Sequence, residues 1–161
     1  MSSSWWKGER GEWYVVVQFI LFGIIFLAPF LTSQTSGWSD PWHMIGRVLG
    51  ILLVILGGIL ALAGLASLGR NLAVVPYPKD DASFVGYGAY KIVRHPIYSG
   101  IILGAFGWGL LMNSVFTLLL AAVLFLFFDI KSRREEQWLG EKFDGYAAYQ
   151  QRVHKLLPFV Y

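Results

Sequence analysis

Two groups of polar residues at the ends of one long apolar stretch could carry out chemistry. Arg94-His95-Pro96 places a cation and an imidazole directly before Ile97–Phe128, a stretch without a charged residue. Two adjacent carboxylates, Glu135 and Glu136, follow that stretch. If the apolar stretch folds back on itself as a helical hairpin, both polar groups lie on the same side of a lipid bilayer. The sequence therefore predicts a polar pocket beside lipid.

The triplet Arg94-His95-Pro96 also predicts the start of a helix. Proline disfavours helical dihedral angles in the residue before it, and it is accepted in the first turn of a helix. The free N–H groups of a helix N-terminus beside an arginine favour an anion such as a carboxylate or a phosphate. Two interpretations stay open: an anion site, or an Arg94 that reaches lipid phosphates while His95 caps the helix.

The carboxylate pair has two interpretations as well. Adjacent residues on a helix point about 100° apart, so one glutamate can face the interior while the other faces water. An inward carboxylate suits a ribose diol or an ammonium group, whereas Arg133 and Arg134 could pair with both glutamates on a solvated surface. A retaining glycosidase is disfavoured, because adjacent side chains cannot flank one glycosidic bond.

The composition is that of an integral membrane protein. Of the 161 residues, 56% are hydrophobic and 14% are charged, against roughly 25% charged in soluble domains. The absence of cysteine excludes disulfides, a thiolate nucleophile and cysteine-ligated metals. The length suits one domain, 1–161, with two N-terminal spans in 1–68 and a core in 69–161.

Three apolar stretches predict the membrane-spanning helices. A span needs about 20 apolar residues, which Tyr14–Leu31 and Val48–Leu68 supply. Ile97–Phe128 would be about 48 Å long as one helix, too long for a bilayer core of about 30 Å. Splitting it at Asn113-Ser114 gives a hairpin. We therefore expect an all-α membrane protein with about four transmembrane helices and an amphipathic helical tail from Lys131 onward.

The distribution of cations predicts the orientation of these spans. Every lysine and arginine except Arg47 falls in the segments 1–13, 69–96 and 129–161, which four spans place on one side. By the positive-inside rule, both termini and the tail are cytoplasmic. This rule also accounts for the net charge of +3 without a nucleic-acid partner. His43 is expected on the side opposite His95 and His154, so the sequence predicts no shared metal site.

Small residues on the second and third spans predict a close contact between helices. Gly57, Ala61 and Gly64 recur at three- to four-residue spacing, and Gly100 and Gly104 are four residues apart. Such spacing lets two helix backbones approach closely. The contact could serve packing alone, or it could form a groove through which a ligand passes.

Two motifs resemble those of the isoprenylcysteine carboxyl methyltransferase family. The stretch 88–100, GAYKIVRHPIYSG, is similar to that family's G-x-Y-x-x-x-R-H-P-x-Y-x-G motif. The family's closing segment is resembled by Glu135-Glu136, Leu139, Phe143, Tyr146, Tyr149, Val153 and Pro158-Phe159. The resemblance covers roughly residues 69–159, whereas the first two spans match in hydrophobic character only.

The resemblance implies an integral membrane methyltransferase that uses S-adenosylmethionine and contains no Rossmann domain. It implies that Glu135 holds the cofactor and that Arg94 steadies a carboxylate of cofactor or substrate. Lys131 stands where the family often has a substrate-contacting arginine, and lysine keeps the charge but loses the bidentate fork. The residues implied to line the cofactor site are Ser83, Phe84, Val85, Tyr90, His95, Pro96, Ile97, Tyr98 and Glu135.

The function that the resemblance favours is carboxyl O-methylation of a prenylcysteine-like, lipophilic acceptor that reaches the site from the membrane lipid. One alternative is a methyltransferase acting on a phospholipid amine or another small acceptor, since the phospholipid amine N-methyltransferases share the membrane plan and a Glu-Glu feature. A second alternative is a membrane scaffold without catalytic activity. Cofactor binding separates the enzymes from the scaffold, and the identity of the methylated atom separates the enzymes from each other.

Overall fold

The computed structural model describes residues 10–32, 38–73, 75–158 and 160–161. The predicted position of the N-terminus and Phe159 of the closing motif therefore lie outside the described residues. Within them the chain is helical, as predicted, and its only strand-like feature is an isolated bridge between Val93 and His154. The helices are α1 (Glu12–Leu31), α2 (Trp42–Leu68), α3 (Pro96–Leu111), α4 (Val115–Lys142) and α5 (Tyr146–Gln150), with 3₁₀ turns at Gly69–Asn71 and Gly88–Lys91.

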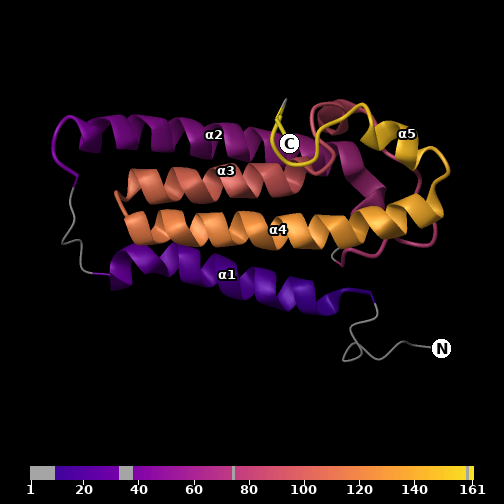
Figure 1. Ribbon diagram of the computed structural model, residues 1–161, viewed down its shortest axis with the longest axis horizontal. Helices are drawn as coiled ribbons and strands as arrows, with labels where there is room; N and C mark the ends of the chain where they lie inside the picture. The colour runs from indigo at the N-terminus through magenta and orange to yellow at the C-terminus, as the bar shows by residue number, and fades with distance from the viewer. Residues whose placement is uncertain (1–9, 33–37, 74, 159) are drawn as a thin grey trace.

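The predicted hairpin is confirmed, with its turn at Asn113-Ser114. Helix α3 ends at Leu111 and α4 begins at Val115, so the long apolar stretch is divided near its middle. Ser114 caps α4, since its side chain accepts a 3.2 Å hydrogen bond from the backbone N–H of Thr117. Asn113 takes the left-handed conformation, φ 50°, that reverses the chain. The two helices lie side by side in Figure 1.

The tail differs from the prediction, because α4 continues through its first part. We expected a separate amphipathic helix, or two short ones, from Lys131 onward; instead α4 runs unbroken to Lys142, and only α5 is separate. No proline interrupts the helix after the apolar segment, and Arg133 pairs with Asp129 one turn earlier at 2.8 Å. The polar end of α4 therefore projects beyond the apolar segment and carries Glu135 and Glu136.

Three of the helices are long and apolar enough to cross a membrane: α1, α2 and α4. Helix α3 is apolar but has 16 residues, which is about 24 Å of helix and shorter than a bilayer core. Many large apolar side chains of the outer helices are exposed, for example Phe19 and Leu62 at 63% and 66%. Such surfaces suit contact with lipid rather than water.

Helices α2 and α3 pack against each other through glycines. A Cβ atom added to Gly57 would lie 2.5 Å from the carbonyl oxygen of Gly100, and one added to Gly50 would lie 2.7 Å from that of Gly107. The predicted close approach is therefore confirmed at Gly57 and Gly100. Opposing backbone fills the space at these contacts, so the interface serves packing and contains no groove there.

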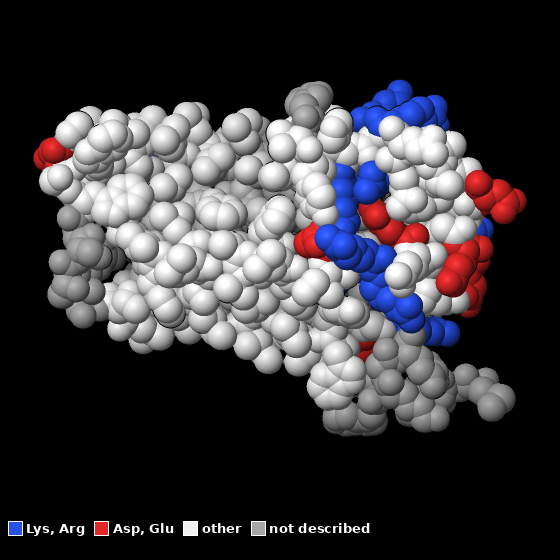
Figure 2. All heavy atoms as spheres, in the orientation of Figure 1, with Lys and Arg blue, Asp and Glu red and all other residues white. Residues whose placement is uncertain are grey.

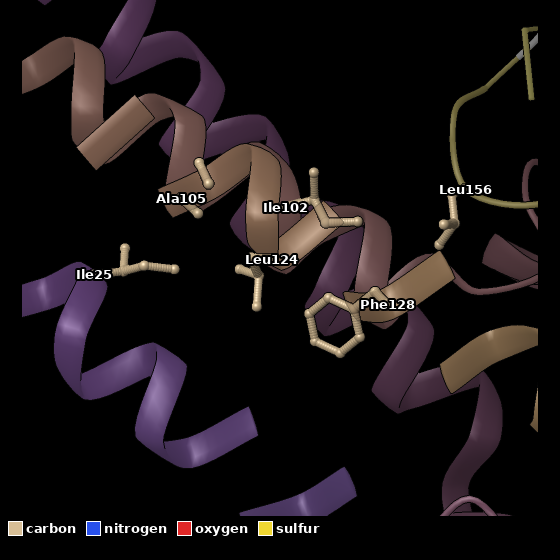
Figure 3. Packing of buried hydrophobic residues seen from close by; sticks show 7 residues of the cluster. Ile25, Ile102, Ala105, Leu124, Phe128 and Leu156 are labelled. Carbon is tan, nitrogen blue, oxygen red and sulfur yellow. The ribbon is translucent and has the colours of Figure 1, made fainter. Parts of the chain in front are cut away.

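The tail returns to the helices and completes the core (Figure 3). Leu156 is fully buried in the same cluster as Ile102 of α3 and Phe128 of α4. The carbonyl oxygen of Leu156 accepts a 2.6 Å hydrogen bond from Ser99 Oγ. The tail is thus fixed against the start of α3, where the polar residues of the two motifs meet.

Candidate active site

Charged side chains gather at one end of the helices. In Figure 2 they lie at the end that carries α5 and the C-terminus, and the rest of this face is almost entirely uncharged. The polar end of α4 and the loop between α2 and α3 supply these residues. If the apolar helices are buried in lipid, this charged end contacts water and lipid headgroups.

A cavity of about 270 Å³ lies at this charged end. It is bounded by the end of α2, the loop after it, the first turns of α3, the polar part of α4 and the tail around α5. One side chain of α1, Gln18, also reaches it. The predicted catalytic and cofactor-binding residues that line it are Ser83, Phe84, Val85, Tyr90, Arg94, His95, Ile97, Tyr98, Lys131 and Glu135.

Pro96 is the residue of that prediction that the structure does not place at the cavity. It occupies the first turn of α3 and is fully buried. A Cβ atom added to Gly64 of α2 would lie 2.9 Å from Pro96 Cγ. Because its ring packs into α2, Pro96 fixes where α3 begins, and the neighbouring His95 and Ile97 reach the cavity instead.

Arg94 forms a buried ion pair with Glu136. Arg94 Nε donates to Glu136 Oε1 at 2.7 Å, and the two side chains are 12% and 10% exposed. Its Nη1 donates to the carbonyl oxygens of Gln150 and Val153 at 2.9 and 2.6 Å. The prediction that Arg94 steadies a ligand carboxylate is not tested by these contacts, but they commit most of its N–H groups to α4 and the tail.

Glu136 faces inward and Glu135 lines the cavity, so the structure differs from the arrangement that the sequence allowed, in which one glutamate faces water. Besides Arg94, Glu136 contacts His95 Nε2 through Oε1 at 3.0 Å and accepts from Gln150 Nε2 at 3.0 Å. Both glutamate side chains can point toward the protein interior because the tail covers the side of α4 that would otherwise be exposed to water. The sequence predicts no specific role for Glu136, whose side chain joins α4 to the start of α3 and to the tail.

Glu135 is the carboxylate of the cavity. It is the more exposed of the two glutamates, and its Oε2 accepts a 2.7 Å hydrogen bond from Tyr98 Oη. His95 Nδ1 lies 3.9 Å from the same oxygen, and the His95 ring stacks on Tyr98 with 5.4 Å between centroids. Within the described ranges no hydrogen bond reaches Glu135 Oε1, so Glu135 can accept hydrogen bonds from a ligand or balance a positive charge.

Lys131 is a buried cation on the side of the cavity nearest the apolar helices. It is 3% exposed, and its Nζ donates to Gln18 Oε1 at 2.6 Å. The Nζ also lies 4.8 Å from the ring centroid of Tyr98 and 5.7 Å from that of Phe128. Among the described residues, no carboxylate forms an ion pair with it, so Lys131 can attract an anionic ligand group.

Aromatic residues of the loop and tail form another wall of the cavity. Phe84 packs edge-on against Tyr149 and Tyr146, with ring centroids 5.2 and 6.2 Å apart. Tyr149 Oη donates a 2.6 Å hydrogen bond to the carbonyl oxygen of Tyr90. Burial raises the pKa of Tyr149 to about 12 and raises the pKa of Tyr146 well above its usual range. These phenols therefore stay neutral and offer apolar faces to a ligand.

Tyr146, Tyr149 and Gln18 are among the cavity-lining residues that the sequence did not predict for the site. Tyr146 and Tyr149 were assigned to the closing motif without a role in the site, although their three-residue spacing places both on one helix face. Gln18 was not singled out at all. Its signal was a lone amide within the apolar run Val15–Phe22, since polar residues inside a span usually have a functional partner. Among the described residues, no cluster of three or more histidines and carboxylates could hold a metal ion.

The helical fold and the polar cavity at one end of its apolar helices define a class of helical membrane proteins with a polar cavity at one end. The sequence profile of phospholipid methyltransferases matches residues 45–145, more than half of the chain. The chain belongs to this phospholipid methyltransferase family. The matched region contains α2, α3, α4 and every cavity residue between Leu65 and Phe143.

Similar curated proteins agree with the resemblance found in the sequence. A probable protein-S-isoprenylcysteine O-methyltransferase of Oryza sativa subsp. indica is 31% identical over 115 residues, covering 69% of this chain and 60% of the relative. The protein-S-isoprenylcysteine O-methyltransferase of Saccharomyces cerevisiae is 33% identical over 117 residues, covering 70% and 49%. The cobalt-zinc-cadmium resistance protein CzcN of Cupriavidus metallidurans is 30% identical over 150 residues, covering 92% and 62%.

These matches confirm the relationship to isoprenylcysteine methyltransferases. The chain spans about half to just under two thirds of the length of these three relatives. The activity, substrate and partners of this protein are therefore taken up below as proposals.

Proposed function

We propose that this protein is an integral membrane methyltransferase that transfers the methyl group of S-adenosylmethionine to the carboxylate of a lipophilic, prenylcysteine-like acceptor. The observation that carries this proposal is the presence of a carboxylate and a separate cation in one cavity. Glu135 and Lys131 are one turn apart on α4 and both line the cavity. A cationic cofactor and an anionic acceptor each find the charge that they need, with the apolar helices adjacent.

The residues of the cavity fit S-adenosylmethionine. Glu135 offers a carboxylate to the ribose hydroxyls or the ammonium group, and Phe84, Tyr146 and Tyr149 offer aromatic faces to the adenine or the sulfonium. Tyr98 holds Glu135 in place through its 2.7 Å hydrogen bond. When bound, the cofactor would supply a methyl group on a positively charged sulfur. A nucleophile attacking the methyl carbon would displace the sulfur as a neutral thioether.

The acceptor side of the cavity is defined by Lys131 and by apolar side chains. Leu65, Leu68, Ile97 and Ile101 line the cavity where α2 and α3 approach it. We propose that the lipophilic tail of the acceptor lies along these residues while Lys131 orients the carboxylate. A carboxylate needs no general base to be methylated, so the side chains act by orienting two substrates and by excluding water.

We propose four spans, with the cavity and both termini on the cytoplasmic side. The charge asymmetry supports this topology, as does the hairpin of α3 and α4, which returns the chain to the charged end (Figures 1 and 2). Helix α3 is short for a span, but it is enclosed by α2 and α4. Reporter fusions at Met1 and Tyr161 should both report cytoplasm, and reporters on opposite sides would contradict four spans.

An amine N-methyltransferase is the second candidate, and the family profile of phospholipid methyltransferases favours it. Glu135 could bind an ammonium group, whereas the buried cation Lys131 would repel one. Product analysis separates the two. The full chain in detergent is incubated with methyl-labelled S-adenosylmethionine and either a farnesylated cysteine or phosphatidylethanolamine. Label released as methanol by mild alkali supports the carboxyl ester; alkali-stable label on the amine rejects it.

A further inference from the structure

Gln18 joins the first helix to the acceptor side of the cavity. It lies within the apolar part of α1, and its side chain is half-buried. Its Oε1 accepts the 2.6 Å hydrogen bond from Lys131 Nζ, although the two residues are 113 positions apart. Both side chains line the cavity. An amide inside a span indicates a function when its partner is a buried cation.

The chemistry of the two groups fixes how Gln18 is oriented. An ammonium group only donates hydrogen bonds, so Gln18 must turn its carbonyl oxygen toward Lys131. The NH₂ group of Gln18 then points elsewhere, and the described part of the chain supplies no acceptor for it. Lys131 has three N–H groups and one hydrogen-bond acceptor, Gln18 Oε1, among the described residues. N–H donors on two adjacent side chains therefore remain for a ligand.

Two donors on different atoms do what one ammonium cannot. A lysine attracts a carboxylate as a point charge, whereas the arginine fork binds both oxygens and fixes their orientation. Lys131 is buried, and its ammonium group lies near the rings of Tyr98 and Phe128. The Gln18 amide is held next to it by the 2.6 Å hydrogen bond, so the pair presents donors at fixed positions.

We propose that Gln18 and Lys131 together form a two-donor site that binds both oxygens of the acceptor carboxylate. Gln18 is then a specificity-determining residue, because its NH₂ group supplies the second hydrogen-bond donor that an arginine side chain would provide and a lysine side chain does not. This inference rests on the proposed carboxyl methylation and adds the group that orients the acceptor. It also gives α1 a part in acceptor binding.

The test measures acceptor KM, kcat and cofactor Kd for the full chain, with N-acetyl-S-farnesylcysteine as acceptor. Gln18→Leu removes both the donor and the acceptor of the amide, and should raise the acceptor KM about tenfold or more. Gln18→Glu should raise KM further, because the new carboxylate pairs with Lys131 and repels the acceptor. Cofactor Kd should stay within about twofold in both variants. Ile20→Leu, on the exposed face of α1, is the matched control and should behave as wild type.

Repeating the Gln18 substitution in a Lys131→Arg variant distinguishes a role in acceptor binding from a purely structural role. Lys131→Arg places two donors on a single side chain, so Gln18→Leu should raise KM only about threefold or less in that background. If Gln18 only supports α1, its substitution raises KM equally in both backgrounds, and the inference is overturned. A wild-type enzyme that esterifies the acceptor, with KM unchanged in Gln18→Leu, also overturns it while the proposed function stands. A wild-type chain that binds cofactor but esterifies no prenylcysteine overturns both.

Discussion

Arg94 Nε lies 2.7 Å from Glu136 Oε1, and this contact joins two motifs that are 42 residues apart in the sequence. The same guanidinium reaches two carbonyl oxygens of the tail. One side chain therefore fixes the start of α3, the polar end of α4 and the segment after α5. The cavity lies among these three elements, so its shape depends on an ion pair that forms only part of its wall.

Removal of the Glu136 charge should destabilise the protein. Glu136→Gln leaves Arg94 buried without its counter-charge, and we expect a loss of about 3 kcal/mol or more. Thermal unfolding in detergent, followed by circular dichroism, measures the change. The matched control is Arg133→Ala, which breaks the ion pair with Asp129; the Arg133 side chain is 65% exposed, so its loss should destabilise the protein far less than Glu136→Gln does. Equal losses in the two variants would contradict a structural role for Glu136.

Cofactor binding should depend on Glu135. Glu135→Gln keeps the size of the side chain and removes its charge, and should weaken S-adenosylmethionine binding by about 1–3 kcal/mol. His95→Ala should weaken it as well, since His95 lines the cavity and stacks on Tyr98. Tyr98→Phe loses only the hydrogen bond to Glu135 and should cost about 0.5–1.5 kcal/mol. Isothermal titration calorimetry gives the affinities; unchanged values in folded Glu135 and His95 variants would place the cofactor elsewhere.

The glycine contact between α2 and α3 should tolerate no side chain. Gly57→Ala puts a methyl group 2.5 Å from the Gly100 carbonyl oxygen, and should lower stability by about 1–3 kcal/mol. Gly58→Ala is the control, because no atom lies within 4 Å of the added Cβ atom. That variant should melt at the wild-type temperature or slightly above it, since alanine favours a helix. A Gly57→Ala protein as stable as wild type would show that the two helices are farther apart.

Alkaline pH should lower the stability of the folded protein through Tyr149 of the tail. Burial raises the pKa of Tyr149 from 10.0 to about 12, so the folded protein holds this proton more tightly than the unfolded chain. The resulting stabilisation is complete below pH 10 and is lost as the pH rises from 10 to about 12. Melting temperatures measured across that window should fall more steeply for wild type than for Tyr149→Phe, which lacks the titrating hydroxyl. Parallel curves for the two proteins would exclude Tyr149 as a source of the slope.

The sequence by itself determined the properties that depend on short stretches of chain. The apolar run Ile97–Phe128 is too long for one span and contains Asn113-Ser114, a pair that favours a turn, so the hairpin could be predicted. The motif around Arg94-His95-Pro96 identified the family, and most of the residues carried over from it do line one cavity. Such features can be predicted from the sequence because hydrophobic length, turn chemistry and motif spacing each depend on a short stretch of chain.

Tertiary packing decided the rest. Both glutamates face inward because the tail, held through Leu156, covers the side of α4 that an isolated helix would expose. Gln18 meets Lys131 because α1 packs against α4, and no local pattern relates residues 113 positions apart. Packing decides which helix faces meet and are buried away from water. A buried donor or charge needs a hydrogen-bond partner, and only the groups on the facing helices are close enough to provide one.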